Sequence, residues 1–165
     1  MSDRPSQLWK EMPVEKRQLA AEAFWRDDES PEIQAQHVEA LVAIARRLNF
    51  RAKSVQALPV ERRAKHLAQM RDVSDALATR ALIAYHFATQ RPLMTTFLDA
   101  LGIAHNEGLI TAEEVTPPNR EQLEAATAAL LAAHPDDDAR RYLKTLVALD
   151  EDTWVNLPAV LGATD

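Results

Sequence analysis

Cysteine is absent from this chain of 165 residues. Its absence excludes disulfide bonds, cysteine-ligated zinc or iron–sulfur sites, and a cysteine nucleophile. Only 3 glycines occur, too few for the glycine-rich loops that cradle phosphate in nucleotide-binding proteins. Aromatic residues make up 5% of the chain, so Leu, Ile, Val and Ala must supply most of the hydrophobic core.

Long apolar runs are also missing. No apolar stretch approaches the roughly 20 residues that a membrane-spanning helix needs. The start of the chain is polar and lacks the apolar region of a signal peptide. We therefore expect a soluble protein in the cytoplasm that makes no contact with a membrane.

The composition is that of an ordinary globular protein, with 47% hydrophobic and 27% charged residues. A chain of this length is long enough to bury a sizeable core within one domain. We expect a single helical domain over residues 1–165, with its core over about 13–161 and a peripheral segment at 1–12.

Helix-favouring residues dominate the sequence, because Ala, Leu, Glu and Arg lose little side-chain entropy in a helix. Prolines and capping residues divide it into helices expected at 5–9, 14–25, 31–48, 52–57, 59–70, 74–90, 92–101, 119–133, 136–149 and 153–161. Residues 76–87 are apolar on nearly every side, which predicts the most buried helix. The predicted fold class is all-α, a compact single-domain bundle of about seven to nine helices.

One short segment recurs. Met-Pro-Val-Glu-Lys-Arg at 12–17 is followed about 46 residues later by Leu-Pro-Val-Glu-Arg-Arg at 58–63. The spacing fits a bundle built from two related helical hairpins. The alternative is that Pro-Val-Glu is a favourable way to begin a helix and is used twice.

Catalytic motifs are absent. No His has a Glu three residues before it, and the chain contains no His-Glu-x-x-His, phosphate-loop or Gly-x-Ser-x-Gly motif. We predict no catalytic residue, no metal site and no cofactor, and the sequence favours a protein that is not an enzyme.

Residues 108–114 are similar to the second half of an EF-hand calcium loop. The first half departs from that pattern, because Ile103, His105 and Glu107 occupy the positions of three oxygen ligands. We expect instead a turn around 106–108, with Thr111 capping one helical turn through Glu114.

A polar pocket inside the bundle is one candidate site. His37 lies on the apolar stripe of its helix, and Tyr85 and His86 lie midway along the most buried helix, with Arg80 nearly two turns earlier. Histidine could act there as acid or base and arginine could bind an anion. The alternative is that each side chain is hydrogen-bonded locally or reaches the surface.

The three tryptophans, Trp9, Trp25 and Trp154, all fall near the ends of expected helices. Each could anchor a helix end onto the core. Each could instead be exposed as the anchor of a protein interface, where Trp and Arg are enriched.

Charge is unevenly distributed along the chain. Residues 46–91 carry about ten bases and three acids, whereas residues 1–45 carry about nine acids and five bases, and residues 92–165 about thirteen acids and four bases. The basic residues concentrate in the stretch Arg46, Arg47, Arg51, Lys53, Arg62, Arg63 and Lys65.

Several interpretations of this basic stretch are open. It could be solvated or paired with acids of the same chain, or it could bind an acidic protein or the acidic end of a second copy, head to tail. Nucleic acid is not the expected partner, because the net charge is −6 and no base-reading array is evident. We expect a protein-interaction or regulatory module, with a small-ligand or anion-binding bundle as the alternative.

Overall fold

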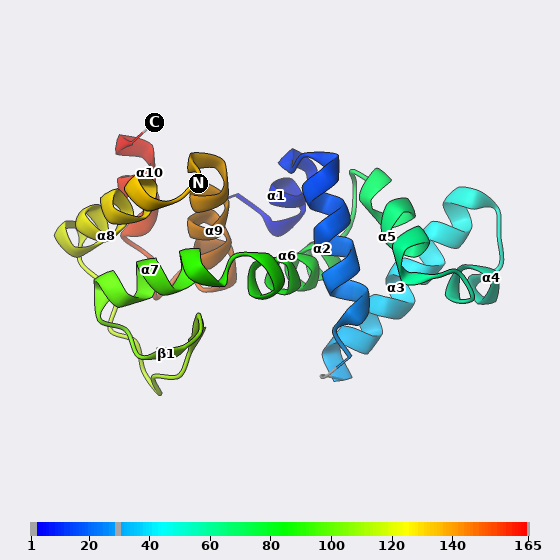
Figure 1. Cartoon of the computed structure of the whole chain (residues 1–165), viewed down its shortest axis with the longest axis horizontal. Helices are drawn as coiled ribbons and strands as arrows, with labels where there is room; N and C mark the ends of the chain where they lie inside the picture. Colours follow the sequence, from blue (N-terminus) through cyan, green and yellow to red (C-terminus); the bar gives the residue numbers. More distant parts are fainter. Residues whose placement is uncertain (1–2, 29–30, 165) are drawn as a thin grey trace. The chain divides into compact units, whose positions relative to one another are not determined.

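The computed structural model describes residues 3–28 and 31–164. Within these residues the chain forms ten helices and one two-stranded sheet (Figure 1). The elements are α1 (Pro5–Glu11), α2 (Val14–Arg26), α3 (Pro31–Leu48), α4 (Ala52–Gln56), α5 (Val60–Gln69), α6 (Asp75–Thr89), α7 (Arg91–Leu101), β1 (His105–Asn106), β2 (Leu109–Ile110), α8 (Arg120–Ala133), α9 (Asp136–Leu149) and α10 (Leu157–Ala163). The predicted all-α fold is confirmed, and each of the ten expected segments overlaps a helix, although the bundle was expected to hold about seven to nine.

Contacts between residues divide the chain into two units. The N-terminal unit is Arg4–Ala88, and the C-terminal unit contains Asp3 and the residues from Thr89 onward. The single domain expected over residues 1–165 stays a prediction. No helix of the described residues is both long enough and apolar enough to cross a membrane.

Two similar series of helices build the N-terminal unit. Each series runs from a short helix through a medium one to a long one, first α1, α2 and α3 and then α4, α5 and α6. The two medium helices, α2 and α5, form the most extensive helix contact of the chain, and Figure 1 shows them alongside each other. Fully buried alanines on both helices allow a close approach: Ala20, Ala21, Ala64 and Ala68.

The recurring six-residue segment stands at the start of both helices. Its last residue is Arg17 in α2 and Arg63 in α5. The Arg17 Nε donates a hydrogen bond to the carbonyl oxygen of Ala68, near the end of α5. The Arg63 guanidinium lies over the ring of Trp25, near the end of α2. Each matched arginine thus contacts the far end of the other helix, as two related hairpins would arrange them.

Tryptophan side chains anchor helix ends in both units. Trp9, Trp25 and Trp154 are all buried, and Trp9 donates from Nε1 to the Met70 carbonyl oxygen at 2.8 Å. Their burial agrees with anchoring rather than with an exposed interface. Leu8, Trp9 and Met12 are all buried, so residues 8–12 of the segment expected to be peripheral contribute to the core.

Helix α6 is the most buried helix of the described chain, as its apolar sequence predicts. Seven of its residues are buried. Its start is joined to α1 by Asp75, which accepts hydrogen bonds from the Arg4 side chain and from the Ser6 backbone N–H.

Aromatic rings fill the core of the C-terminal unit. Phe97 of α7 contacts Tyr142 of α9 and Trp154, with ring centroids 5.9 Å apart in both pairs. Helix α7 packs against α8, and α10 contacts both α8 and α9. Gly102, with φ of 69°, ends α7, and Asn119 and Gln122 form the predicted capping box of α8.

A small β-hairpin connects α7 to α8. His105 pairs with Ile110 and Asn106 with Leu109. The turn expected at 106–108 is confirmed, with positive φ at Glu107 and Gly108. The helical turn expected from Thr111 to Glu114 is wrong, because these residues have no helical structure and the Thr111 N–H continues the hairpin by bonding to the Ala104 carbonyl oxygen.

Candidate functional site

The four residues of the predicted polar pocket make separate local contacts. His37 on α3 packs against α2, with its ring 4.7 Å from that of Phe24 and 5.1 Å from that of Trp25. Its Nε2 hydrogen-bonds the Phe24 carbonyl oxygen at 2.7 Å. Since a carbonyl only accepts, Nε2 carries the proton. Every ring contact and hydrogen bond of His37 in the described chain is with α2.

The other three pocket residues lie on α6. Tyr85 and His86 are buried and their rings touch, with centroids 5.4 Å apart. His86 bonds through Nδ1 to the Leu82 carbonyl oxygen one turn earlier. Arg80 is partly exposed. The structure therefore brings Tyr85 and His86 together, while His37 contacts a different helix.

A different arginine lies near His37. The guanidinium of Arg63 is centred 4.8 Å above the ring of Trp25, which also touches His37. Two N–H donors of this cluster, Trp25 Nε1 and Arg63 Nε, are buried without a hydrogen-bond partner in the described chain. Buried donors are usually hydrogen-bonded, so these two N–H groups are candidate ligand-binding donors.

The predicted basic stretch forms an exposed surface on the N-terminal unit. Arg63 turns inward over Trp25, whereas its six neighbours are exposed. We call these six residues the basic face: Arg46 and Arg47 at the end of α3, Arg51 and Lys53 at α4, and Arg62 and Lys65 on α5. Helix α4 packs against α3, and α3 also contacts α5, so the three helices carry the face together.

The six cations of the basic face form no close pair with an acid of the described residues. In the part of the chain that the structure describes, none of its six residues forms an ion pair or a side-chain hydrogen bond. Glu61 is the single acid between positions 46 and 71, and it pairs with Arg26 at 3.1 Å. Ion pairs within the described residues therefore do not account for the stretch.

The positive field of the face acts on a neighbouring histidine. Burial, followed by the charges of Arg62, Arg47 and Lys65, lowers the pKa of His66 below its usual 6.5. Arg47 comes from α3 and the other two cations from α5, so cations of both helices converge on one place.

Phe50 is an exposed aromatic residue within the basic face. It is 55% exposed and lies between Arg47 and Arg51 in sequence. Asn49 adopts φ of 57°, and the Phe50 N–H bonds to the Ala45 carbonyl oxygen at 2.8 Å. This is a Schellman motif, which fixes the backbone at the end of a helix. Phe50 is therefore held at the surface on an ordered backbone.

The C-terminal unit contains an open groove of about 400 Å³, which we call the α7–α8 groove. It lies between the end of α7, the segment after the hairpin and the start of α8. Its apolar lining includes Leu101, Ile103, Ala112, Val115 and Pro118, with Glu114 as its one acid. No residue of the predicted pocket lines it. Sequence reasoning missed both this groove and Phe50.

Metal ligands are not gathered anywhere in residues 3–28 and 31–164. No group of three or more His, Asp or Glu side chains there could hold a metal ion. The basic face and the cluster around Trp25 offer exposed positive charge, an exposed aromatic ring at Phe50 and buried N–H donors.

Comparison with known proteins adds no relative. No protein family, curated protein sequence or solved structure matches this chain.

Proposed function

We propose that this chain is a protein-interaction module without catalytic activity, whose basic face binds an acidic segment of a protein partner. The observation that carries the proposal is the set of six exposed cations without an ion pair in the described chain, with Phe50 exposed between Arg47 and Arg51 in the sequence. On ordinary protein surfaces, cations are interspersed with acids. Between positions 46 and 71 the single acid is Glu61, so the cations of this stretch are not interspersed in that way.

Recognition of an acidic segment would use both the six cations of the basic face and the exposed side chain of Phe50. Opposite charges accelerate encounter and fix orientation, but exposed ion pairs add little affinity by themselves. An anchoring aromatic residue supplies the apolar contact that ion pairs lack. Phe50 suits this role because its backbone is already ordered and little entropy is lost on binding.

An acidic protein fits the chain better than nucleic acid does. Residues 89–165 carry thirteen acids and five bases, which would repel a phosphate backbone. An acidic peptide can alternate its charges with apolar residues and so carries fewer charges than a nucleic acid of the same length, which reduces that repulsion. Single-stranded RNA also combines negative charge with bases that stack on aromatic side chains. The test therefore includes RNA as the alternative ligand.

The experiment measures binding of two labelled probes by fluorescence anisotropy. One is a peptide of alternating Glu and Leu, about 12 residues long, and the other is oligouridine of matched length. We expect the peptide to bind and the double variant Arg47→Ala/Arg51→Ala to bind it about tenfold more weakly. Phe50→Ala should weaken it while leaving the salt dependence unchanged.

The matched control is Arg71→Ala, which removes an exposed cation outside the basic face and should leave affinity unchanged. A peptide of alternating Lys and Leu should not bind. Tighter binding of oligouridine than of the acidic peptide would overturn the proposal, and so would peptide binding that survives the double variant.

A second candidate function is supported by the two unpaired donors. We propose that Trp25, Arg63 and His37 bind a small anion, with Trp25 Nε1 and Arg63 Nε donating to it. This keeps the predicted anion-binding bundle but replaces Arg80 with Arg63 as the anchor. An arginine whose Nε is buried without a carboxylate partner in the described chain favours an anionic acceptor over a neutral one.

Titration with inorganic phosphate, followed through the indole N–H signals in NMR spectra, tests this second candidate. The Trp25 signal, assigned with Trp25→Phe, should shift on adding phosphate and stop shifting in Arg63→Gln. The Trp9 signal should stay in place, because its N–H already donates to Met70. An unmoved Trp25 signal throughout the titration would eliminate the site for this anion.

A further inference from the structure

We infer that the α7–α8 groove of a second copy of this chain is a partner of the basic face, so that copies associate head to tail. This inference rests on the proposed function, since it names one occupant of the same surface. It is carried by three complementary features of the two surfaces: shape, apolar character and charge.

Shape and apolar character come first. Phe50 presents a ring that is 55% exposed on an ordered backbone. The α7–α8 groove is open to solvent and lined mainly by apolar side chains. Its volume of about 400 Å³ falls in the range of pockets that hold small ligands and is large enough for one benzyl side chain. Inserting the ring would remove apolar surface of both partners from water.

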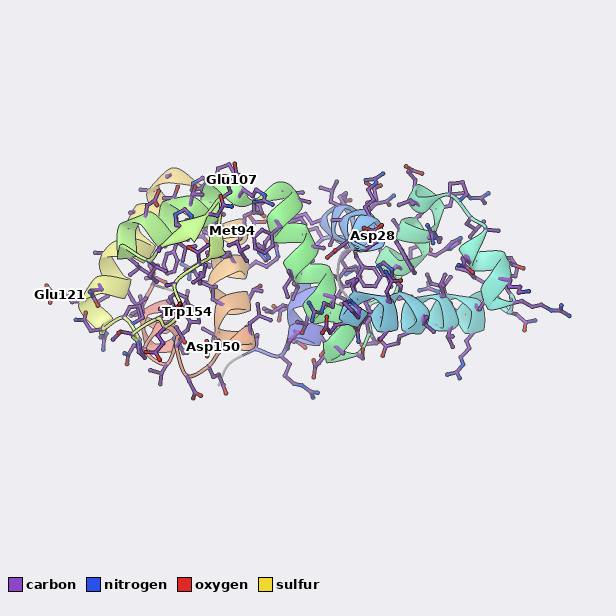
Figure 2. All side chains as sticks on the ribbon, turned by 90° about the horizontal axis from the view of Figure 1, so that it is seen from below. Asp28, Met94, Glu107, Glu121, Asp150 and Trp154 are labelled. Atoms are coloured by element: carbon purple, nitrogen blue, oxygen red, sulfur yellow. The ribbon has the colours of Figure 1, made fainter. Side chains whose placement is uncertain are left out.

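Charge provides the second match. Glu114 lines the groove. Glu113 is the residue before Glu114 in the sequence, and Glu121 is next to the lining residue Gln122. Figure 2 shows Glu121 projecting outward from the start of α8. These three exposed carboxylates have no ion pair in the described chain. In an associated pair, these carboxylates of one copy would lie near Arg47 and Arg51 of the other copy, the two cations that flank Phe50 in the sequence.

The geometry of such an association follows from where the two surfaces lie. One belongs to the N-terminal unit and the other to the C-terminal unit, so the contact is heterologous and leaves one free surface at each end of a pair. One ring in an open groove buries less area than a stable dimer needs. Association should therefore be weak, in the micromolar range, and should decrease as salt is added.

Sedimentation velocity on the full chain tests this inference. The weight-average mass should rise with protein concentration at low salt and fall back toward the monomer at high salt. Two variants remove one surface each. Phe50→Ala/Arg51→Ala disables the basic face, and Glu113→Lys/Glu114→Lys disables the groove. Each variant alone should remain monomeric.

Mixing the two variants gives the sharpest readout. The face variant keeps its groove and the groove variant keeps its basic face, so an equimolar mixture should form a one-to-one dimer and grow no further. A symmetric contact between two basic faces or two grooves would not be restored by mixing. The controls are Arg71→Ala and Glu32→Lys, which change exposed charges outside both surfaces and should associate like the parent chain.

Failure of this inference is distinguishable from failure of the proposed function. A parent chain that stays monomeric at all concentrations, or a mixture that stays monomeric, overturns head-to-tail association. If the acidic peptide still binds the basic face, the proposed function stands with a different protein as partner. If the peptide does not bind, the proposed function fails whatever the oligomeric state.

Discussion

The Nε of Arg17 donates a hydrogen bond of 2.7 Å to the carbonyl oxygen of Ala68, joining α2 to the end of α5. The same guanidinium donates from its terminal nitrogen to the Met12 carbonyl oxygen at 2.9 Å and to that of Lys10 at 3.3 Å. Arg17 is buried and contacts carbonyls rather than a carboxylate. Its charge is stabilised by the negative ends of two helices.

Replacing Arg17 should therefore destabilise the N-terminal unit. Arg17→Ala removes all three hydrogen bonds and leaves buried carbonyl oxygens unpaired, which should lower the free energy of unfolding by about 3 kcal/mol. Arg17→Lys should recover only part of this loss, because an ammonium cannot reproduce the planar array of donors. Urea unfolding followed by circular dichroism measures both changes.

Arg62→Ala is the matched control for this prediction. Arg62 is an exposed arginine on α5 whose side chain forms no hydrogen bond in the described chain, so its loss should change the free energy of unfolding by less than about 0.5 kcal/mol. Similar effects of the two substitutions would contradict the structural role of Arg17.

Local sequence signals account for most of the fold. Helix boundaries follow from residues that act on their own neighbours: Asn119 and Gln122 cap α8, and Gly102 ends α7. The β-hairpin gave no such signal, because strands of two residues are too short to show alternation. Its turn at 106–108 was predicted, and it has positive φ at Glu107 and Gly108.

Nonlocal packing explains what the sequence could not predict about the site. Arg62 and Arg63 are adjacent, and a helix directs them about 100° apart, yet only the packing of α5 on α2 decides that Arg63 turns inward. His37 contacts α2 for the same kind of reason, so its pairing with Tyr85 and His86 could not be judged from spacing. Phe50 is apolar, and only the fold reveals that it is exposed.

Gly108 should resist substitution for two reasons. Its φ is 96°, and a Cβ atom there would lie 2.8 Å from the Cε of Met94; Figure 2 shows Met94 beside the hairpin that carries Glu107. Gly108→Ala should lower the free energy of unfolding by about 2 kcal/mol. Gly102 also has a positive φ, of 69°, but a Cβ atom there would meet open space, so Gly102→Ala should cost about 1 kcal/mol. Equal losses in thermal or urea unfolding would contradict the steric contribution of Met94.

Asp75 should make stability depend on pH in the acid range. Its hydrogen bonds from Ser6, together with Arg4, lower its pKa from 3.8 to about 2. The hydrogen bonds of the folded state favour the charged carboxylate, so the pKa of Asp75 is lower in the folded protein than in the unfolded chain. The stabilisation that Asp75 provides is therefore complete above about pH 5 and is lost as pH falls toward 2. Asp75→Asn should be less stable than the parent near neutral pH and should approach it in acid.

Urea midpoints measured from neutral pH down to about pH 3 test the Asp75 prediction. The control is Asp72→Asn, because Asp72 pairs with Lys10 at 3.0 Å but its side chain is 85% exposed and contributes little. If Asp75→Asn follows the parent curve at every pH, the contact between α1 and α6 does not stabilise the fold.

His66 offers a direct measure of the field at the basic face. Burial and the charges of Arg62, Arg47 and Lys65 lower its pKa, so Arg47→Ala/Arg62→Ala should raise that pKa, as seen by NMR titration of the imidazole. Arg71→Ala should leave it unchanged. An acidic peptide on the face should also raise the pKa, because its carboxylates favour the protonated imidazole. Binding would then take up protons and tighten as pH falls through the pKa of free His66. Peptide binding with no change in the His66 titration would place the peptide elsewhere.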